Sequence, residues 1–208
     1  MDRMSPSIVL ASASPRRAAL LRQLGVSFTQ MACADDEPRP AGIGPSAHAT
    51  EAARGKARGV RSLLQTRNPR PDQTIVIGAD TLVCIDGEIL GKPLDRSDAA
   101  RMLTALSGNT HQVYTGICIL SPYGTQMEDC SCTQVAFKPL SAADIESYVN
   151  SGEPMDKAGS YGIQGLGARF VERIEGCYYN VVGLPLSLLT NLMQSAGYDF
   201  TQSPHDQR

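Results

Sequence analysis

The sequence lacks the features that would place it in or beyond a membrane. Among its 208 residues, no apolar run approaches the roughly 18 residues that a membrane-spanning helix requires. The opening segment, MDRMSPSIVLASASPRR, has a short apolar run broken by serines and followed by arginines. A secretory signal has its basic part first and a longer apolar part second. We therefore expect a cytoplasmic protein with no membrane contact.

The sequence also lacks the spacing of a structural zinc site. Its six cysteines contain no C-x-x-C pair, and its three histidines are not at zinc-ligand spacing. Cys130 and Cys132 form a C-x-C pair, which strand alternation would place on one face. Reduced, structural thiols are the expected state in the cytoplasm.

An excess of basic charge is absent as well. The chain has 19 Lys and Arg against 21 Asp and Glu, a net charge of −2. A general nucleic-acid binder would be basic overall, so no stable nucleic-acid complex is expected. The balance is uneven, however: residues 1–70 hold 11 basic and 5 acidic side chains (+6), and residues 71–208 hold 8 and 16 (−8). The basic third raises the question of which anion it meets.

The hydrophobic pattern predicts one α/β domain over residues 1–200 and a disordered tail over 201–208. Hydrophobic residues make up 42% of the chain, enough for a sizeable core. Predicted helices and strands mix without strict alternation, and Asp86-Gly87 is a strong hairpin signal, so we expect a mixed sheet. The predicted strands are 8–11, 74–78, 82–85, 88–90, 113–120 and 129–137. The predicted helices begin at 14–15, 47, 97, 141 and 185, and 33–50 is expected to be a surface loop.

The segment Ser12-Ala-Ser14-Pro15-Arg16-Arg17 follows the first predicted strand and opens a helix. Ser14 suits the N-cap, and Pro15 suits the first helical position. Two arginines in the first turn are repelled by the partial positive charge of the helix start, and a bound anion would relieve this repulsion. Arginine binds phosphate through paired N–H groups. The segment indicates a phosphate site, and an exposed basic turn explains it equally well.

A carboxylate, Asp80, follows the predicted strand at 74–78. Open α/β sheets place their ligands at the carboxyl ends of strands, and Asp can act as a general base or a metal ligand. The alternative is a strand-end Asp that bonds to its own turn. The D-x-D pattern of phosphotransfer aspartates fails, because Leu82 stands two residues after Asp80.

Three adjacent acids, Asp35-Asp36-Glu37, lie in the predicted loop. Their mutual repulsion would be relieved by a divalent cation, and Mg²⁺ takes one or two carboxylates together with phosphate oxygens. A solvated acidic loop is the alternative. Lys56, Lys92 and Lys157 are each ordinary surface lysines when taken singly.

Residues 157–167, KAGSYGIQGLG, are dense in glycine, which allows a close backbone approach to a ligand. Tyr161 and Gln164 could contact a base, since an amide both donates and accepts. The usual G-x-G-x-x-G and Walker patterns are absent, and a glycine-rich turn region is the alternative.

Read in order, these segments resemble the Maf family of septum formation inhibitors, regarded as nucleoside triphosphate pyrophosphatases. The resemblance runs from about Ile8 to Gly197. It is carried by SASPRR at 12–17, the DDE loop, KAR at 56–58, GADT at 78–81, GKP at 91–93, LSGNTHQV at 106–113, KAGSYGIQG at 157–165 and NVVGLP at 180–185.

The resemblance implies the elongated mixed-sheet ITPase-like (Maf/Ham1) fold, with two lobes around a central cleft. It implies a hydrolase of acid anhydrides that cleaves a nucleoside triphosphate between its α- and β-phosphates, giving the monophosphate and pyrophosphate. It further implies a link to cell-division arrest and is compatible with a homodimer.

The resemblance also implies roles for single residues. Asp80 matches the catalytic base, and Glu37 with Asp80 matches the carboxylates that hold Mg²⁺ or Mn²⁺. The sequence departs from the pattern at Asp36, where relatives often have the longer Glu. Arg16, Thr81 and Gln164 match substrate-specificity positions, and the phosphate-binding positions are Ser12, Arg16, Arg17, Lys56, Lys92 and Lys157.

The GADT and GSYGIQG forms resemble the branch that acts on dTTP and UTP, including pseudo-UTP and 5-methyl-UTP. Such an enzyme would keep modified nucleotides from being incorporated. The alternatives are a non-catalytic regulator of septum formation that binds protein or nucleic acid, a 7-methyl-GTP pyrophosphatase of the same family, and an enzyme that releases orthophosphate from the γ position.

Overall fold

The computed structural model describes residues 6–33, 42–67 and 73–198 and contains one mixed sheet. The strand order is β2–β1–β3–β5–β6–β7, with β4 also paired to β3. β1 is parallel to β2 and β3, and the remaining pairs are antiparallel. The strands are β1 (Ser7–Ala11), β2 (Thr29–Gln30), β3 (Thr74–Ile85), β4 (Glu88–Leu90), β5 (Thr110–Leu120), β6 (Gln126–Phe137) and β7 (Val171–Glu175).

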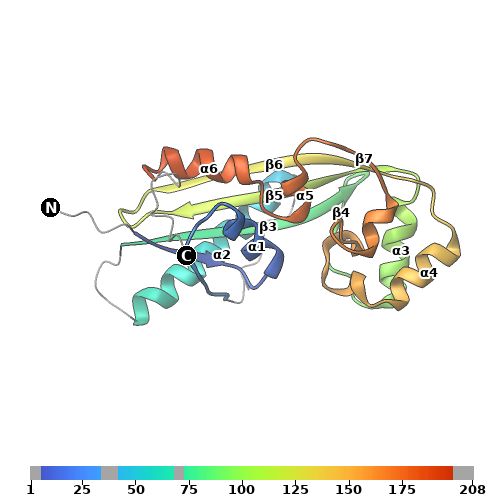
Figure 1. Cartoon of the computed structure of the whole chain (residues 1–208), viewed down its shortest axis with the longest axis horizontal. Helices are drawn as coiled ribbons and strands as arrows, with labels where there is room; N and C mark the ends of the chain where they lie inside the picture. The colour runs from blue at the N-terminus through green and yellow to red at the C-terminus, as the bar shows by residue number, and fades with distance from the viewer. Residues whose placement is uncertain (1–5, 34–41, 68–72, 199–208) are drawn as a thin grey trace.

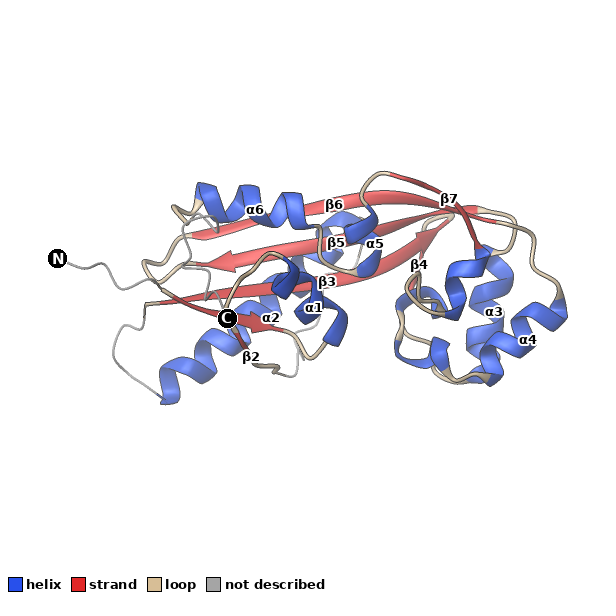
Figure 2. Ribbon diagram, viewed as in Figure 1, coloured by secondary structure: helices blue, strands red, loops and turns tan. Residues whose placement is uncertain are grey.

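The helices cover the sheet in separate groups. They are α1 (Pro15–Gln23), α2 (Pro45–Arg67), α3 (Arg96–Leu106), α4 (Ala142–Asn150), α5 (Tyr178–Val182) and α6 (Leu186–Ser195). The long strands β3, β5 and β6 run through the whole molecule, with α3 and α4 gathered at one end and α1, α2 and α6 towards the other (Figures 1 and 2). The expected elongated α/β fold with a mixed sheet and two lobes is confirmed.

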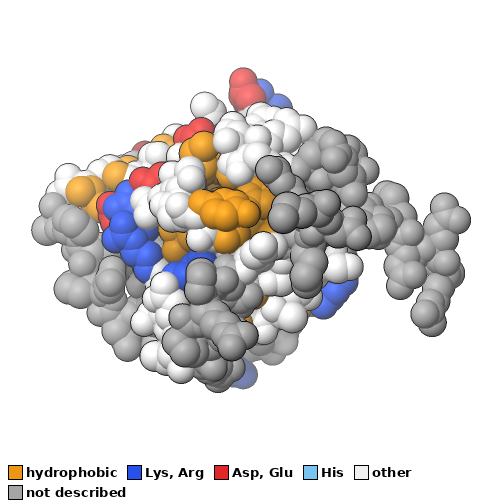
Figure 3. Space-filling view, turned by 90° about the vertical axis from the view of Figure 1, so that its left-hand side faces the viewer, with side chains coloured by type: hydrophobic (Ala, Val, Ile, Leu, Met, Phe, Trp, Pro, Cys, Tyr) orange, Lys and Arg blue, Asp and Glu red, His pale blue; other side chains and the backbone are white. Residues whose placement is uncertain are grey.

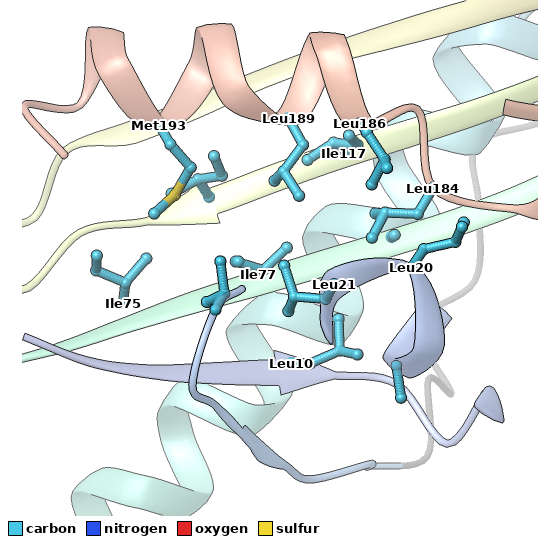
Figure 4. Close-up of a cluster of buried hydrophobic side chains, with 14 of the residues drawn as sticks. Leu10, Leu20, Leu21, Ile75, Ile77, Ile117, Leu184, Leu186, Leu189 and Met193 are labelled. Atoms are coloured by element: carbon cyan, nitrogen blue, oxygen red, sulfur yellow. The ribbon is translucent and has the colours of Figure 1, made fainter. Parts of the chain in front are cut away.

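The larger lobe is built on a core between one face of the sheet and α1 and α6. Leu186 and Leu189 of α6 lie beside Ile117 of β5, Met193 of α6 points into the same core, and Leu21 of α1 lies beside Ile77 of β3 (Figure 4). Leu21, Ile77, Ile117, Leu189 and Met193 have no exposed surface. Their burial removes apolar area from water, which is the main stabilising contribution of such a layer.

The smaller lobe has its own core at the far ends of the same strands. Val83 of β3 and Val135 of β6 pack with Leu103 of α3, and Tyr148 and Phe170 meet edge to face with centroids 5.0 Å apart. Because β3, β5 and β6 contribute to both cores, the sheet itself joins the two lobes.

Helix α2 lies unusually close to the other face of the sheet. Ala49, Ala53 and Ala57 recur every fourth residue on α2 and have no exposed surface. They face Gly78 of β3 and Gly116 of β5, where a Cβ atom would overlap the helix backbone. Small residues on both sides therefore set this helix-to-sheet distance.

Local signals at the ends of elements are confirmed. Ser14 caps α1 by accepting a hydrogen bond from Arg17 N–H, and Ser141 with Asp144 forms a capping box on α4. Asp86 and Gly87 both have positive φ, as the predicted tight hairpin requires.

Several predicted boundaries are wrong. The strand expected to end at Gly78 continues to Ile85, because β5 pairs with β3 from Val76 to Cys84 and holds it extended. Helix α2 starts at Pro45, inside the expected loop 33–50. Strands β2 and β7 and helix α5 were not expected, since each is five residues or shorter and has no clear periodicity. The tail 201–208 lies outside the described residues.

The end of the molecule that carries the β5–β6 turn exposes an apolar patch beside Lys and Arg side chains (Figure 3). Tyr123, in that turn, is 81% exposed. Within the described residues, no helix is long and apolar enough to cross a membrane.

Replacing Gly116 with Ala should test the close approach of α2. The added Cβ would overlap the backbone at Ala49 and Thr50, and overpacking of this kind costs about 1–3 kcal/mol. Gly44→Ala is the matched control, because nothing lies within 4 Å of its Cβ position. We expect urea unfolding to show a lower midpoint for Gly116→Ala alone; equal midpoints for both variants would contradict the packing argument.

Candidate active site

The candidate site lies where one edge of β3 loses its neighbour. On that edge β1 pairs with β3 as far as Gly78, and β4 joins only at Val83. In the described part of the chain, residues 79–82 therefore have a strand neighbour on the β5 side only. Asp80 and Thr81 lie in this gap, and because successive strand side chains alternate, they point to opposite faces of the sheet.

A cavity of about 540 Å³ opens at this gap. It is lined by residues from β1, α1, α2, β3, the segment after β4, residues 156–164 and the end of α5. Every predicted site residue within the described part of the chain lines it, namely Ser12, Arg16, Arg17, Lys56, Asp80, Thr81, Lys92, Lys157 and Gln164. The predicted metal ligand Glu37, with Asp35 and Asp36, lies outside the described residues.

Arg17 is a buried guanidinium that ties three segments together. Its side chain donates to the Gly183 carbonyl at 2.8 Å, to Thr81 Oγ1 at 2.9 Å and to Ser12 Oγ at 3.3 Å. Burial lowers the pKa of Arg17, and the nearby Asp80 carboxylate acts in the opposite direction. A guanidinium has five N–H donors, so two remain for an anion in the cavity. Arg17 thus both fixes the wall and can contact phosphate.

Lys56 reaches from α2 to the Asp80 carboxylate and forms an ion pair with it. The side chains are 22% and 21% exposed, so both remain open to the cavity. Since Asp80 points to the α2 face of the sheet, the short distance between α2 and β3 is what allows this contact.

Arg16 and Lys157 approach the cavity from two different segments and meet at Asp156. Arg16 lies 3.5 Å from one Asp156 oxygen, and Lys157 Nζ lies 2.6 Å from the other. Asp156 is 64% exposed, and exposed pairs of this kind contribute little to stability. Arg16 can therefore exchange this carboxylate for a ligand phosphate at small cost. The Lys157 side chain is only 13% exposed and also donates to the Glu153 carbonyl at 2.7 Å, which fixes its position.

Glu153 holds the glycine-dense segment in place. Its carboxylate accepts hydrogen bonds from Tyr148 Oη at 2.8 Å and from the N–H groups of Leu166 and Gly167 at 2.8 and 3.2 Å. Burial acts to raise the pKa of Glu153, but these hydrogen bonds outweigh it and the pKa lies below the ordinary value. The exposed side chain of Gln164 is presented on a segment that is fixed from behind.

The residues present suit a metal that arrives with a phosphate ligand. Among the described residues, no three His, Cys, Asp or Glu side chains form a metal cage. Asp80 offers one carboxylate in a cavity lined by cationic side chains. Mg²⁺ characteristically binds through one or two carboxylates together with substrate phosphates, so the donor set fits this mode.

Comparison with known proteins places the chain. The family model described as Maf-like protein matches residues 7–196. The chain belongs to the Maf family. The expected family membership is confirmed.

Three relatives of this Maf-family chain are all named dTTP/UTP pyrophosphatase. A dTTP/UTP pyrophosphatase of Clostridium perfringens (strain SM101 / Type A) is 46% identical over 93% of this chain and 98% of its own length. One of Clostridium botulinum (strain Okra / Type B1) is 47% identical over 92% and 97%, and one of Pelotomaculum thermopropionicum is 45% identical over the same shares.

Solved structures are more distant. A nucleoside-triphosphatase / dITP/XTP pyrophosphatase of Mycobacterium abscessus aligns over 92% of this chain and 98% of its own, with a TM-score of 0.44 and 13% identity. The Ham1 protein of Staphylococcus aureus aligns over 79% of both chains, with a TM-score of 0.45 and 14% identity.

Some residues of the site were not found from the sequence. Asp156, the Gly183 carbonyl, Thr115 and Asn180 all contact predicted site residues or their partners. Asn180 and Gly183 belong to the NVVGLP block that carries the family resemblance, so a signal existed for them, but no role followed from it.

The cavity wall formed by Tyr161 is backed by a buried histidine. His111 Nε2 lies 2.9 Å from Tyr161 Oη, and the two rings and Phe137 pack edge to face. His111 has no exposed surface, and burial lowers its pKa to about 4.

This histidine should make stability depend on pH. The folded protein keeps His111 neutral down to about pH 4, whereas an unfolded chain protonates histidine near pH 6.5. Unfolding therefore takes up a proton between these values, and the free energy of unfolding falls as the pH is lowered through this window, by about 2–3 kcal/mol in total.

Urea unfolding of the wild type and of His111→Gln between pH 7 and 4 measures this contribution. The wild type should lose more stability than the variant over the window. Parallel profiles for the two proteins would contradict it.

Proposed function

We propose that this Maf-family chain is a nucleoside triphosphate pyrophosphatase that hydrolyses dTTP and UTP, with modified pyrimidine analogues such as pseudo-UTP and 5-methyl-UTP, to the monophosphate and pyrophosphate. The observation that carries the proposal is one cavity that brings Asp80 together with Arg16, Arg17, Lys56 and other cationic side chains. The names of relatives that share almost half of their residues with this chain support the choice of dTTP and UTP.

The cationic side chains suit a triphosphate. Arg16 and Arg17 lie at the N-terminus of α1, where unpaired N–H groups and the helix dipole favour an anion. Lys56, Lys92 and Lys157 line the same cavity from three other segments. Five cations around one cavity would neutralise the charge of the triphosphate and of its transition state.

In the proposed hydrolysis, Asp80 is the general base. Its carboxylate orients a water and takes its proton, while the water oxygen forms a bond to phosphorus. The bond from that phosphorus to the oxygen bridging the α- and β-phosphates breaks at the same time. The electron pair stays on the leaving group, whose charge the lysines and arginines stabilise.

A divalent cation fits this site as a partner of the substrate. Asp80, with Glu37 by the family resemblance, would hold Mg²⁺ or Mn²⁺, which neutralises phosphate charge when bound. The expected cytoplasmic location is part of the proposal. A homodimer and the lack of a nucleic-acid complex stay predictions.

The alternative functions differ in their products. A regulator of septum formation would need no carboxylate among its anion-binding residues. A γ-phosphatase would give the diphosphate and orthophosphate, and a 7-methyl-GTP enzyme would prefer the methylated purine.

Incubation of the purified protein with dTTP, UTP, CTP, GTP and 7-methyl-GTP in the presence of Mg²⁺ tests the proposal. We expect dTTP and UTP to give monophosphate and pyrophosphate, identified by anion-exchange chromatography. Orthophosphate as the first product, preference for 7-methyl-GTP, or no turnover of any nucleotide would each overturn it.

Substitution of Asp80 by Asn tests the assignment of the base. The variant keeps the shape of the side chain but cannot accept a proton, so kcat should fall by at least about 100-fold while the Kd for UTP stays within a few-fold. Asp129→Asn is the matched control, since Asp129 is exposed on β6 and does not line the cavity. Full activity of Asp80→Asn would show that another group takes the proton.

A further inference from the structure

The hydroxyl group of Thr81 is part of a chain of hydrogen bonds that runs from the cavity into the core. Thr81 Oγ1 accepts from Arg17 Nη2 at 2.9 Å and lies 2.9 Å from Thr115 Oγ1. Thr115 has no exposed surface, and its Oγ1 lies 3.0 Å from the backbone carbonyl of Asn180. Of the two threonines, only Thr81 lines the cavity, together with Arg17.

The direction of the protons in this chain follows from its two ends. A carbonyl only accepts and a guanidinium only donates. Thr115 has one hydroxyl proton, which is needed for the Asn180 carbonyl. The contact between the two threonines can then be a hydrogen bond only if Thr81 donates its own proton to Thr115.

Thr81 therefore has no proton left for a ligand. A hydroxyl oxygen has two lone pairs, and Arg17 occupies one, so the cavity side of Thr81 presents the other. This atom can accept a hydrogen bond from an N–H or O–H group of a ligand, and it repels another acceptor such as an ionised phosphate oxygen.

We propose that Thr115 is a positioning residue that fixes Thr81 as an acceptor for the N3–H group of uracil or thymine. Cytosine has an unprotonated acceptor at N3, so its lone pair would face the lone pair of Thr81. The inference rests on the proposed function and deepens it, because it says how this cavity selects uracil and thymine over cytosine. A buried polar site rejects a base with the wrong donor pattern because its own groups lose their partners.

Three variants isolate the direction of the hydroxyl group. Thr115→Val removes the acceptor, frees the Thr81 proton and should lower the ratio of kcat/KM for UTP over CTP by about tenfold. Thr115→Ser keeps the hydroxyl and should keep the wild-type ratio. Thr133→Val is the matched control, because Thr133 is equally buried and bonds to Asn180 and Cys177 without contacting Thr81.

The ratio of kcat/KM for UTP over CTP is the decisive readout, since a merely structural role would change stability without changing the choice between the two bases. A lower ratio in Thr115→Val alone supports the proposal. An unchanged ratio in Thr115→Val, or an equal change in Thr133→Val, overturns it.

A test on the unmodified protein does not depend on whether Thr115→Val folds. N3-methyl-UTP lacks the N3–H group. 5-methyl-UTP also has one extra methyl group, but at C5, so it retains the N3–H group. The kcat/KM for N3-methyl-UTP should be at least about tenfold below that for UTP, with 5-methyl-UTP close to UTP. Equal turnover of N3-methyl-UTP and UTP would overturn the proposal and would point to a ribose hydroxyl as the donor.

Binding of the products separates this inference from the proposed function. Calorimetric Kd values for UMP and CMP need no turnover. The wild type should bind UMP about tenfold more tightly than CMP, whereas Thr115→Val should bind the two nucleotides about equally. If the wild type does not hydrolyse UTP or dTTP, the proposed function fails, and these Kd values still decide the role of Thr115. Equal binding of UMP and CMP by the wild type would contradict that role.

Discussion

The site depends on one interruption in the hydrogen bonding of the sheet. β5 holds β3 extended along almost its whole length, while on the other edge the pairing with β1 ends at Gly78 and the pairing with β4 begins at Val83, which leaves four residues between them. Those four residues stay in a rigid strand yet are open on one side. Asp80 and Thr81 therefore reach one cavity from opposite faces of the sheet, so that a carboxylate and a hydroxyl group in the same cavity come from adjacent residues. A site on a strand is held more precisely than one on a loop.

The close packing of α2 supplies the other half of this arrangement. Gly78 and Gly116 lie under the alanines of α2, and Gly116 stands directly opposite Asp80 in the β3–β5 ladder. The same absence of side chains that brings α2 onto the sheet leaves the room in which Lys56 reaches Asp80. Conformational freedom is not what these glycines provide, since neither has a positive φ; their role is to let two backbones approach.

Features encoded by near neighbours in the chain could be predicted from the sequence. The caps at Ser14 and Ser141, the Asp86-Gly87 turn and the order of most elements follow from local residue types, and the family motifs brought out the cavity residues that the structure describes. What failed depends on distant partners. The strand at 74–78 could not be seen to continue through Asp80 and Thr81 without knowing that β5 pairs with it. Asp156, Thr115 and the Gly183 carbonyl enter the site only because the fold brings them to Arg16, Thr81 and Arg17, and no local pattern records such contacts.

The continuity of β3, β5 and β6 through both cores has a mechanical consequence. Two lobes joined by a flexible linker can close on a ligand by rotating about a few backbone bonds. Here the junction is three hydrogen-bonded strands, so a rotation of one lobe against the other would have to bend the sheet itself. Rearrangement on ligand binding is therefore expected in exposed side chains such as Arg16, and the sheet sets the shape of the cavity before a ligand arrives.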